Sequence, residues 1–153
     1  MRLLVVILLL GITVQNVRAE NMTPYSGTVI VKTSQAFADY VKNLKAAISA
    51  NKLGIVAEAC ATCGARNIGV TIPGNRVIMV FAPNYAVRML KASVASGIEA
   101  PLRLYVTEQA DGTAILTYRL PSQVFAPYQV EALDQMASEL DQKFARIVAA
   151  AGS

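Results

Sequence analysis

Hydrophobic and polar residues recur with two different periods along the chain, and these periods predict an ordered series of strands and helices. Residues 26–34 are rich in β-branched side chains and predict a first strand. Thr33 or Ser34 then offers an N-cap hydroxyl for a helix. The next hydrophobic residues recur at helical spacing, at Phe37, Val41, Leu44 and Ile48. Residues 54–59 predict a second strand.

The second half of the chain continues the pattern. Residues 76–82 are apolar enough for a central strand, and residues 83–97 predict a helix. The inward face of that helix is expected at Val87, Leu90 (or Met89) and Val94. Residues 102–109 and 113–120 flank Asp111-Gly112, which is a strong hairpin signal. A long closing helix is marked by Leu133, Met136, Leu140, Phe144 and Ile147.

The predicted order is therefore β-α-β-β-α-β-β-α. Hairpin-type links between the second and third strands, and between the fourth and fifth, favour antiparallel pairs over an all-parallel sheet. We expect an α+β protein, a two-layer sandwich with a mostly antiparallel or mixed sheet and helices on one face.

The first 19 residues have the pattern of a signal peptide. Arg2 precedes an unbroken apolar run over residues 3–10, and Val17 and Ala19 place small residues before a cut ahead of Glu20. The run is shorter than the roughly 20 residues that span a bilayer, which disfavours a retained anchor. We expect an exported single domain over residues 20–153, with no membrane span after cleavage.

Charge argues against a nucleic-acid partner. Loss of Arg2 and Arg18 with the signal peptide lowers the formal charge from +4 to +2. The remaining basic residues are scattered singly, whereas a nucleic-acid surface gathers them into a patch.

Three blocks of this chain, residues 74–108, 111–128 and 133–147, resemble the DUF302 family of uncharacterised domains, in particular its exported bacterial branch. The resemblance covers about Gly27 to Ala150. It implies a compact two-layer α+β fold, a homodimer and a bacterial periplasmic location. It implies no established reaction and no catalytic residues to carry over. The C-x-x-C at Cys60 departs from the family, where small residues such as Ala and Ser are expected.

The chain contains no histidine, which limits the catalytic and metal-binding chemistry available to it. Nucleophile–histidine pairs and histidine metal ligands are therefore excluded. Gly64 follows Cys63, so the haem-attachment motif C-x-x-C-H is absent. Glu58, Glu99 and Glu108 lie too far apart in sequence to assign a catalytic carboxylate pair.

Cys60 and Cys63, the two cysteines of the chain, form one C-x-x-C with three interpretations. A local disulfide in an oxidising compartment is favoured. A thioredoxin-like site is disfavoured, because the nine residues before Pro73 leave no room for a helix and a strand, and Gly64 weakens a helix. The third interpretation is a Cu(I) clip of two thiolates, since soft sulfur ligands select Cu(I). No other metal and no cofactor is expected.

Two further groups are candidate ligand-binding residues. Asn84 opens the predicted helix at residue 83, where free backbone amides and Arg88 would receive an anion, although Asn84 is more simply a helix cap. With a two-residue turn at Asp111-Gly112, Tyr105 and Tyr118 would lie directly opposite each other beside Arg103, either lining a pocket or stabilising the sheet. A three-residue loop would remove that pairing.

These observations favour a non-enzymatic periplasmic domain that binds a small ligand or a periplasmic protein. The competing hypothesis is a thiol-dependent redox or Cu(I)-binding protein that uses Cys60 and Cys63.

Overall fold

The computed structural model describes residues 24–153. The strands are β1 (Thr28–Ala36), β2 (Gly54–Ala59), β3 (Asn75–Phe81), β4 (Leu102–Glu108) and β5 (Thr113–Arg119). The α-helices are α1 (Phe37–Ala50), α2 (Ala61–Asn67), α3 (Pro83–Ala92), α4 (Pro121–Phe125) and α5 (Glu131–Gly152). Two short 3-10 helices are η1 (Ala95–Glu99) and η2 (Ala126–Tyr128). The predicted signal peptide lies outside the described residues.

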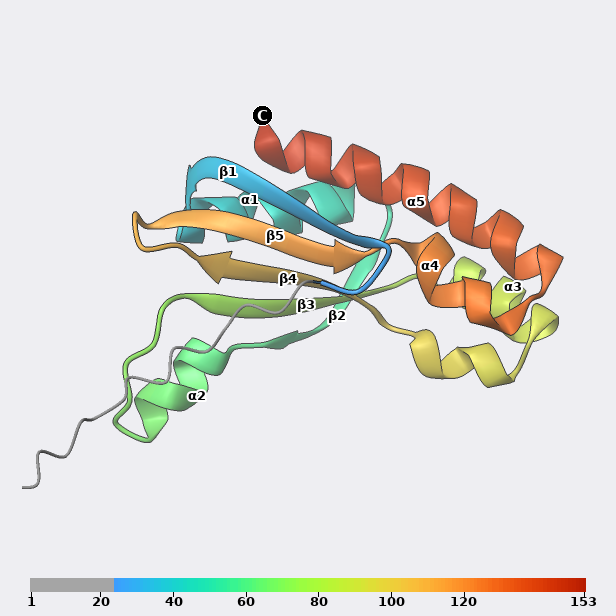
Figure 1. Ribbon diagram of the computed structural model, residues 1–153, viewed down its shortest axis with the longest axis horizontal. Helices are drawn as coiled ribbons and strands as arrows, with labels where there is room; N and C mark the ends of the chain where they lie inside the picture. The colour runs from blue at the N-terminus through green and yellow to red at the C-terminus, as the bar shows by residue number, and fades with distance from the viewer. Residues whose placement is uncertain (1–23) are drawn as a thin grey trace, which may run out of the picture.

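The five strands form one sheet in the order β1-β5-β4-β3-β2, and every neighbouring pair is antiparallel. Both predicted hairpin links are confirmed. Helices α1 and α5 lie along one face of this sheet, while α3 and α4 gather at one end and α2 lies at the other (Figure 1). The predicted α+β two-layer sandwich is therefore the observed fold.

The main core lies between the sheet and the two long helices. Leu44 and Ile48 from α1 are fully buried there, against inward-facing strand residues such as Leu104 and Leu116. The five positions predicted for the inner face of the closing helix are all buried: Leu133, Met136, Leu140, Phe144 and Ile147. Burial of alternate strand residues and of one helix stripe is what holds these layers together.

Two predicted details of the helices are wrong. Strand β1 runs on to Ala36, which precedes α1 directly, so neither Thr33 nor Ser34 caps that helix. Helix α3 buries Met89, the alternative inward position, and leaves Val87, Leu90 and Val94 exposed. Val94 is exposed because α3 ends at Ala92, so Val94 lies beyond the helix on which its inward position was counted.

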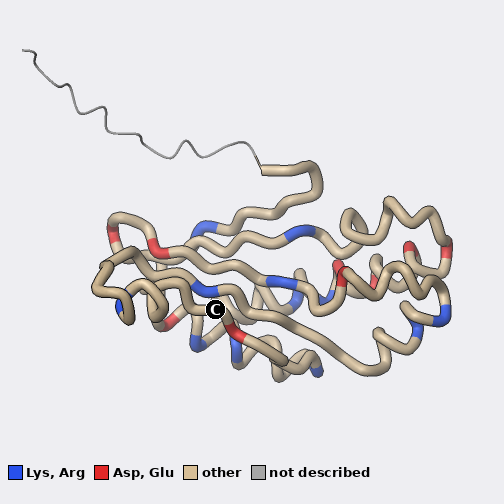
Figure 2. The backbone as a smooth tube through the Cα atoms, turned by 90° about the horizontal axis from the view of Figure 1, so that it is seen from below, with Lys and Arg blue, Asp and Glu red and all other residues tan. Residues whose placement is uncertain are grey.

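Charged residues do not separate by sign. Lysines and arginines occur together with acids at both ends of the molecule (Figure 2). Among residues 24–153, none of the helices combines the length and the hydropathy needed to cross a bilayer.

Candidate functional site

The two cysteines form a disulfide where β2 passes into α2. Cys60 follows the last residue of β2 and is the N-cap of α2, and Cys63 lies in the first turn, with 5.2 Å between their Cα atoms. The backbone N–H of Cys63 donates to Cys60 Sγ at 2.9 Å. Cys60 is half-buried, whereas Cys63 is exposed. The favoured interpretation of the motif as a local disulfide is confirmed, and Cys63 is the more exposed of its two residues.

Helix α2 was not predicted. Gly64 lies in its middle and lowers its intrinsic stability by about 1 kcal/mol relative to alanine. Local bonds hold it instead, because Gly64 N donates to Cys60 O at 3.0 Å and Thr62 Oγ1 donates to Pro73 O at 3.0 Å. After α2 the chain reaches Pro73 and enters β3 directly, without the extra strand of a thioredoxin arrangement.

A cation faces the half-buried sulfur. Arg76, near the start of β3, donates from Nη1 to Cys60 Sγ. The same guanidinium is held in place by its Nε, which lies 2.9 Å from Glu58 Oε1, and by a 2.9 Å bond from Nη1 to Asn75 O. Arg76 is therefore fixed against the disulfide and does not extend freely into solvent.

Glu58 connects the disulfide environment to α1. Its second oxygen, Oε2, lies 2.6 Å from Lys45 Nζ. The hydrogen bond from Lys45 and the charges of Lys45 and Arg76 lower the pKa of Glu58 from its usual 4.5, and partial burial opposes this only in part. Glu58 thus stays ionised at neutral pH and keeps both cations in position.

An open cleft of about 400 Å³ lies against these charged residues, between α1 and the edge of the sheet. Its lining joins apolar and charged side chains, namely Phe37, Ala38, Val41, Lys42, Lys45, Glu58 and Arg76. Three of these residues are cations and one is an anion. Arg76 and Glu58 belong both to this cleft and to the surroundings of Cys60.

The predicted pairing of Tyr105 with Tyr118 is wrong. Tyr105 lies opposite Thr117, and Tyr118 lies opposite Leu104. The hairpin loop has three residues, 110–112, because Gln109 N donates to Thr113 O at 2.8 Å and closes the turn one residue earlier than assumed. A register shift of one residue moves one tyrosine to the other face of the sheet.

The two tyrosines consequently have different surroundings. Tyr118 is buried in the core 5.5 Å from the Phe144 ring, and burial raises the pKa of its hydroxyl. Tyr105 is on the face remote from the two long helices, where its hydroxyl accepts a 2.6 Å bond from Asn75. Arg103 shares that outer face and lines a separate small pocket of about 60 Å³ with Glu99. These three residues do not form a common pocket.

Asn84 and Arg88 belong to α3, which lies at the opposite end of the molecule from α2 (Figure 1). Ala82 is the N-cap of α3, so Asn84 does not cap it, and Ala82 O accepts the N–H groups of Tyr85 and Ala86 at 3.1 Å. Arg88 is held by Glu139 through two bonds of 2.6 and 2.7 Å, and this hydrogen bonding raises the pKa of Arg88. The groups expected to receive an anion are largely engaged already.

Sequence reasoning missed the grouping of Lys45, Glu58 and Arg76. In the sequence Glu58 is one of three carboxylates that lie far apart, and in the structure the other two are elsewhere: Glu99 accepts from Tyr128, and Glu108 accepts from Gly74 N. The antiparallel pairing of β2 with β3 was predictable, but its register was not: Glu58 lies opposite Ile78, which brings Arg76 close to the cysteines.

Comparison with known proteins gives the chain a family. The profile described as "Domain of unknown function DUF302" matches residues 29–151. No curated protein matches. A solved structure, "Crystal structure of uncharacterized conserved protein DUF302 from Bacillus stearothermophilus", is similar at a TM-score of 0.74 and 17% identity, over 83% of this chain and 99% of that one. At that identity the similarity concerns the fold alone. Since the profile covers most of the sequence, the chain belongs to the DUF302 family.

Proposed function

We propose that this DUF302 protein is a thiol–disulfide redox protein whose Cys60–Cys63 pair exchanges two electrons with thiol donors, either one dithiol or two monothiols. The observation that carries the proposal is the contact of the Arg76 guanidinium with Cys60 Sγ. A cation beside one sulfur of a C-x-x-C stabilises the thiolate that reduction creates there. Cys63, the more exposed residue of the pair, supplies the sulfur that is attacked.

Reduction of the Cys60–Cys63 disulfide then proceeds in two thiol–disulfide exchange steps. A donor thiolate attacks Cys63 Sγ, the Cys60–Cys63 bond breaks, and Cys60 leaves as a thiolate facing Arg76. The second thiolate of the donor attacks the donor sulfur in the mixed disulfide and releases Cys63. The donor dithiol becomes a disulfide, having lost two electrons and two protons, and the C-x-x-C gains the two electrons. Cys63 takes up one proton, and the other goes to Cys60 or to solvent.

This proposal is favoured over the two other functions considered from the sequence. A guanidinium at Cys60 Sγ repels Cu(I) from the position that a thiolate clip would need it to occupy. The residues considered for a ligand site, Asn84 and Arg88 on one side and Arg103, Tyr105 and Tyr118 on the other, are dispersed over separate parts of the fold. Export to an oxidising periplasm, which the N-terminal pattern predicts, suits a disulfide that must re-form after use.

The test is a redox equilibrium of the folded mature protein. It is incubated in reduced and oxidised dithiothreitol at set ratios, alkylated and weighed. We expect reversible two-electron reduction with unchanged far-UV circular dichroism. Arg76→Met should make the disulfide harder to reduce, by about 30 mV if it loses about 1.4 kcal/mol of thiolate stabilisation. Arg119→Met, which removes a cation at the end of β5, is the matched control and should leave the potential unchanged.

Two results would overturn the proposal. One is a disulfide that dithiothreitol reduces only after the protein unfolds. The other is an Arg76→Met potential equal to or higher than that of the wild type, since the guanidinium would then have no part in stabilising the reduced state.

A further inference from the structure

The cleft beside the disulfide has a charge distribution that bears on which thiol reacts. Glu58 binds both Lys45 and Arg76, so one negative charge is shared between two positive ones. Lys42, on the same side of α1, makes no ion pair within residues 24–153. Two further carboxylates flank the lining: Asp39 lies in the first turn of α1, and Glu108 accepts a bond from Gly74 N. Within the lining itself, three cations and one anion leave a positive excess.

Its shape and lining suit a small organic anion. The volume of about 400 Å³ is within the range of small-molecule sites. Phe37, Ala38 and Val41 provide apolar contact for a short aliphatic or peptide backbone, while Lys42 and Lys45 present ammonium groups from the same helix. Carboxylates are the groups that such ammonium and guanidinium donors bind best.

The direction of attack on Cys63 limits how close the carboxylate of the attacking thiol can be to its own sulfur. Displacement at sulfur is in line, so a thiolate attacking Cys63 approaches from the side away from Cys60 and Arg76. A carboxylate bound in the cleft is on the Arg76 side. A thiol that satisfies both contacts must have several bonds between its sulfur and its carboxylate.

We infer that the cleft binds the carboxylate of a low-molecular-weight peptide thiol and thereby selects it as the reaction partner of the Cys60–Cys63 disulfide. This inference rests on the proposed redox function and adds the substrate class. Because such a thiol has one sulfur, a second molecule of it attacks the outer sulfur of the Cys63 mixed disulfide, which forms the disulfide of the peptide thiol and releases Cys63 as a thiolate. Lys42, Lys45 and Arg76 are its binding groups, and Cys63 is the sulfur attacked.

The test compares rates of disulfide reduction by three thiols at equal thiolate concentration. Glutathione carries two carboxylates remote from its sulfur, its diethyl ester is the matched uncharged-carboxyl probe, and 2-mercaptoethanol is the small neutral one. We expect glutathione to react roughly tenfold faster than its ester at low salt. Addition of about 0.5 M NaCl should reduce that ratio.

Variants assign the preference to the cleft. Lys42→Gln should lower the glutathione-to-ester ratio, and Lys42→Glu should lower it further. Lys91→Gln removes an exposed lysine from α3 at the other end of the molecule and should leave the ratio unchanged. Circular dichroism confirms that each variant is folded.

Equal rates for glutathione and its ester would overturn the inference, as would a preference that Lys42→Glu leaves intact. Both outcomes leave the redox function standing. Failure of all three thiols to reduce the disulfide would instead contradict the proposed function itself.

Discussion

At the scale of single residues, Glu58 contributes both to the stability of the fold and to the candidate site. It bonds Lys45 at 2.6 Å and Arg76 at 2.9 Å while remaining partly exposed to solvent. Partly exposed pairs of this kind contribute modestly, and the network as a whole should add about 0.5–1 kcal/mol. Removing its charge should therefore weaken the fold slightly without disrupting it.

We predict that Glu58→Gln lowers the free energy of unfolding by about 0.5–1 kcal/mol at neutral pH. The pKa of Glu58 is lowered in the folded state, mainly by the Lys45 hydrogen bond, so this contribution is present above its usual value of 4.5. It is lost as pH falls through the lower folded-state value. Urea unfolding at neutral and acidic pH should show the two proteins converging in acid. A difference in unfolding free energy between wild type and Glu58→Gln that persists at low pH would show that ionisation of Glu58 is not its source.

A second residue-scale prediction concerns Tyr40. Its side chain is 1% exposed, and its hydroxyl has no hydrogen-bond partner among the described residues. An unsatisfied buried hydroxyl is unfavourable, so Tyr40→Phe should stabilise the protein by about 0.5–1 kcal/mol. The exposed Tyr25→Phe should have no effect.

Ionisation of Tyr40 should also change the stability of the protein at alkaline pH. Burial, with a smaller contribution from Tyr118, raises the pKa of Tyr40 from 10.0 to about 12. Because the unfolded chain ionises first, wild-type stability should decline as pH rises from about 10 to about 12. Tyr40→Phe should decline less over that interval, and chemical denaturation at several alkaline pH values measures the difference. Parallel declines would contradict the assignment.

At the scale of elements, the hydrophobic pattern predicted all five strands, because alternation and helical spacing are local properties of the chain. It failed where length or register depends on a few hydrogen bonds. The Asp111-Gly112 signal did not reveal that Gln109 closes a three-residue loop. Helix α2 buries no residue, so its sequence contains no apolar stripe from which a helix could be predicted.

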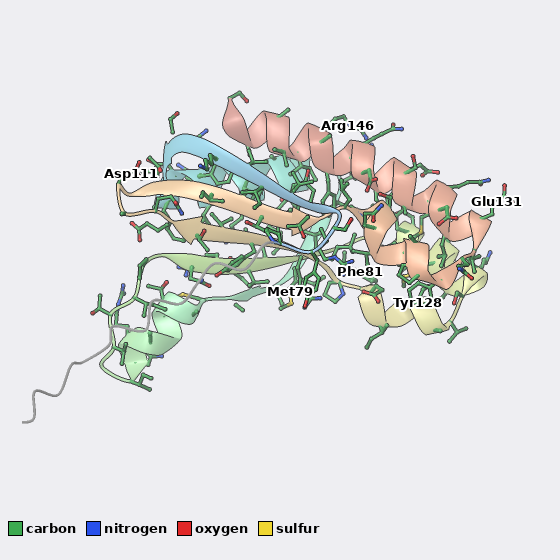
Figure 3. The ribbon with its side chains drawn as sticks, in the orientation of Figure 1. Met79, Phe81, Asp111, Tyr128, Glu131 and Arg146 are labelled. Carbon is green, nitrogen blue, oxygen red and sulfur yellow. A yellow bond between two sulfur atoms is a disulfide. The ribbon has the colours of Figure 1, made fainter. Side chains whose placement is uncertain are left out.

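The candidate site was hidden for a related reason. Arg76 and Cys60 lie 16 residues apart, and the contact of the arginine with the cysteine depends on the pairing of β2 with β3. That register cannot be counted across a connection that contains an unpredicted helix. Figure 3 shows how far the fold separates parts of the chain: Asp111, at the tip of the β4–β5 hairpin, lies at one end of the molecule, and Tyr128 and Glu131 lie at the other.

Two glycines in the β2–β3 connection give an element-scale prediction. A Cβ on Gly74 would be 2.6 Å from Phe37 ring atoms and 2.9 Å from Glu108 Oε2, so Gly74→Ala should destabilise the protein by about 1–3 kcal/mol. A Cβ on Gly64 would meet nothing within 4 Å, and Gly64→Ala should stabilise α2 by about 0.5–1 kcal/mol. Urea denaturation of both variants checks this. Equal effects would show that the close approach of Phe37 to Gly74 does not constrain the connection.

At the scale of the whole molecule, the disulfide lies outside the core. The buried cluster joins α1, α5 and the inner face of the sheet, and it includes no residue of α2. The disulfide is thus attached to the fold at the end of β2 and the start of β3. We therefore expect the two packed layers to stay intact when the disulfide is reduced.

The last prediction follows from that separation. A disulfide between residues three apart closes a very small loop, so it constrains the unfolded chain little and should contribute about 1–2 kcal/mol. Reduction, or the double variant Cys60→Ser, Cys63→Ser, should lower the free energy of unfolding by that amount and keep a single cooperative transition. Oxidised, reduced and variant proteins are compared by urea unfolding in the presence or absence of reductant. The variant, which has no thiols, is its own control for effects of the reductant. If reduction abolished cooperative unfolding, the disulfide would be a structural requirement of the fold, and a protein that must cycle through the reduced state could not depend on it.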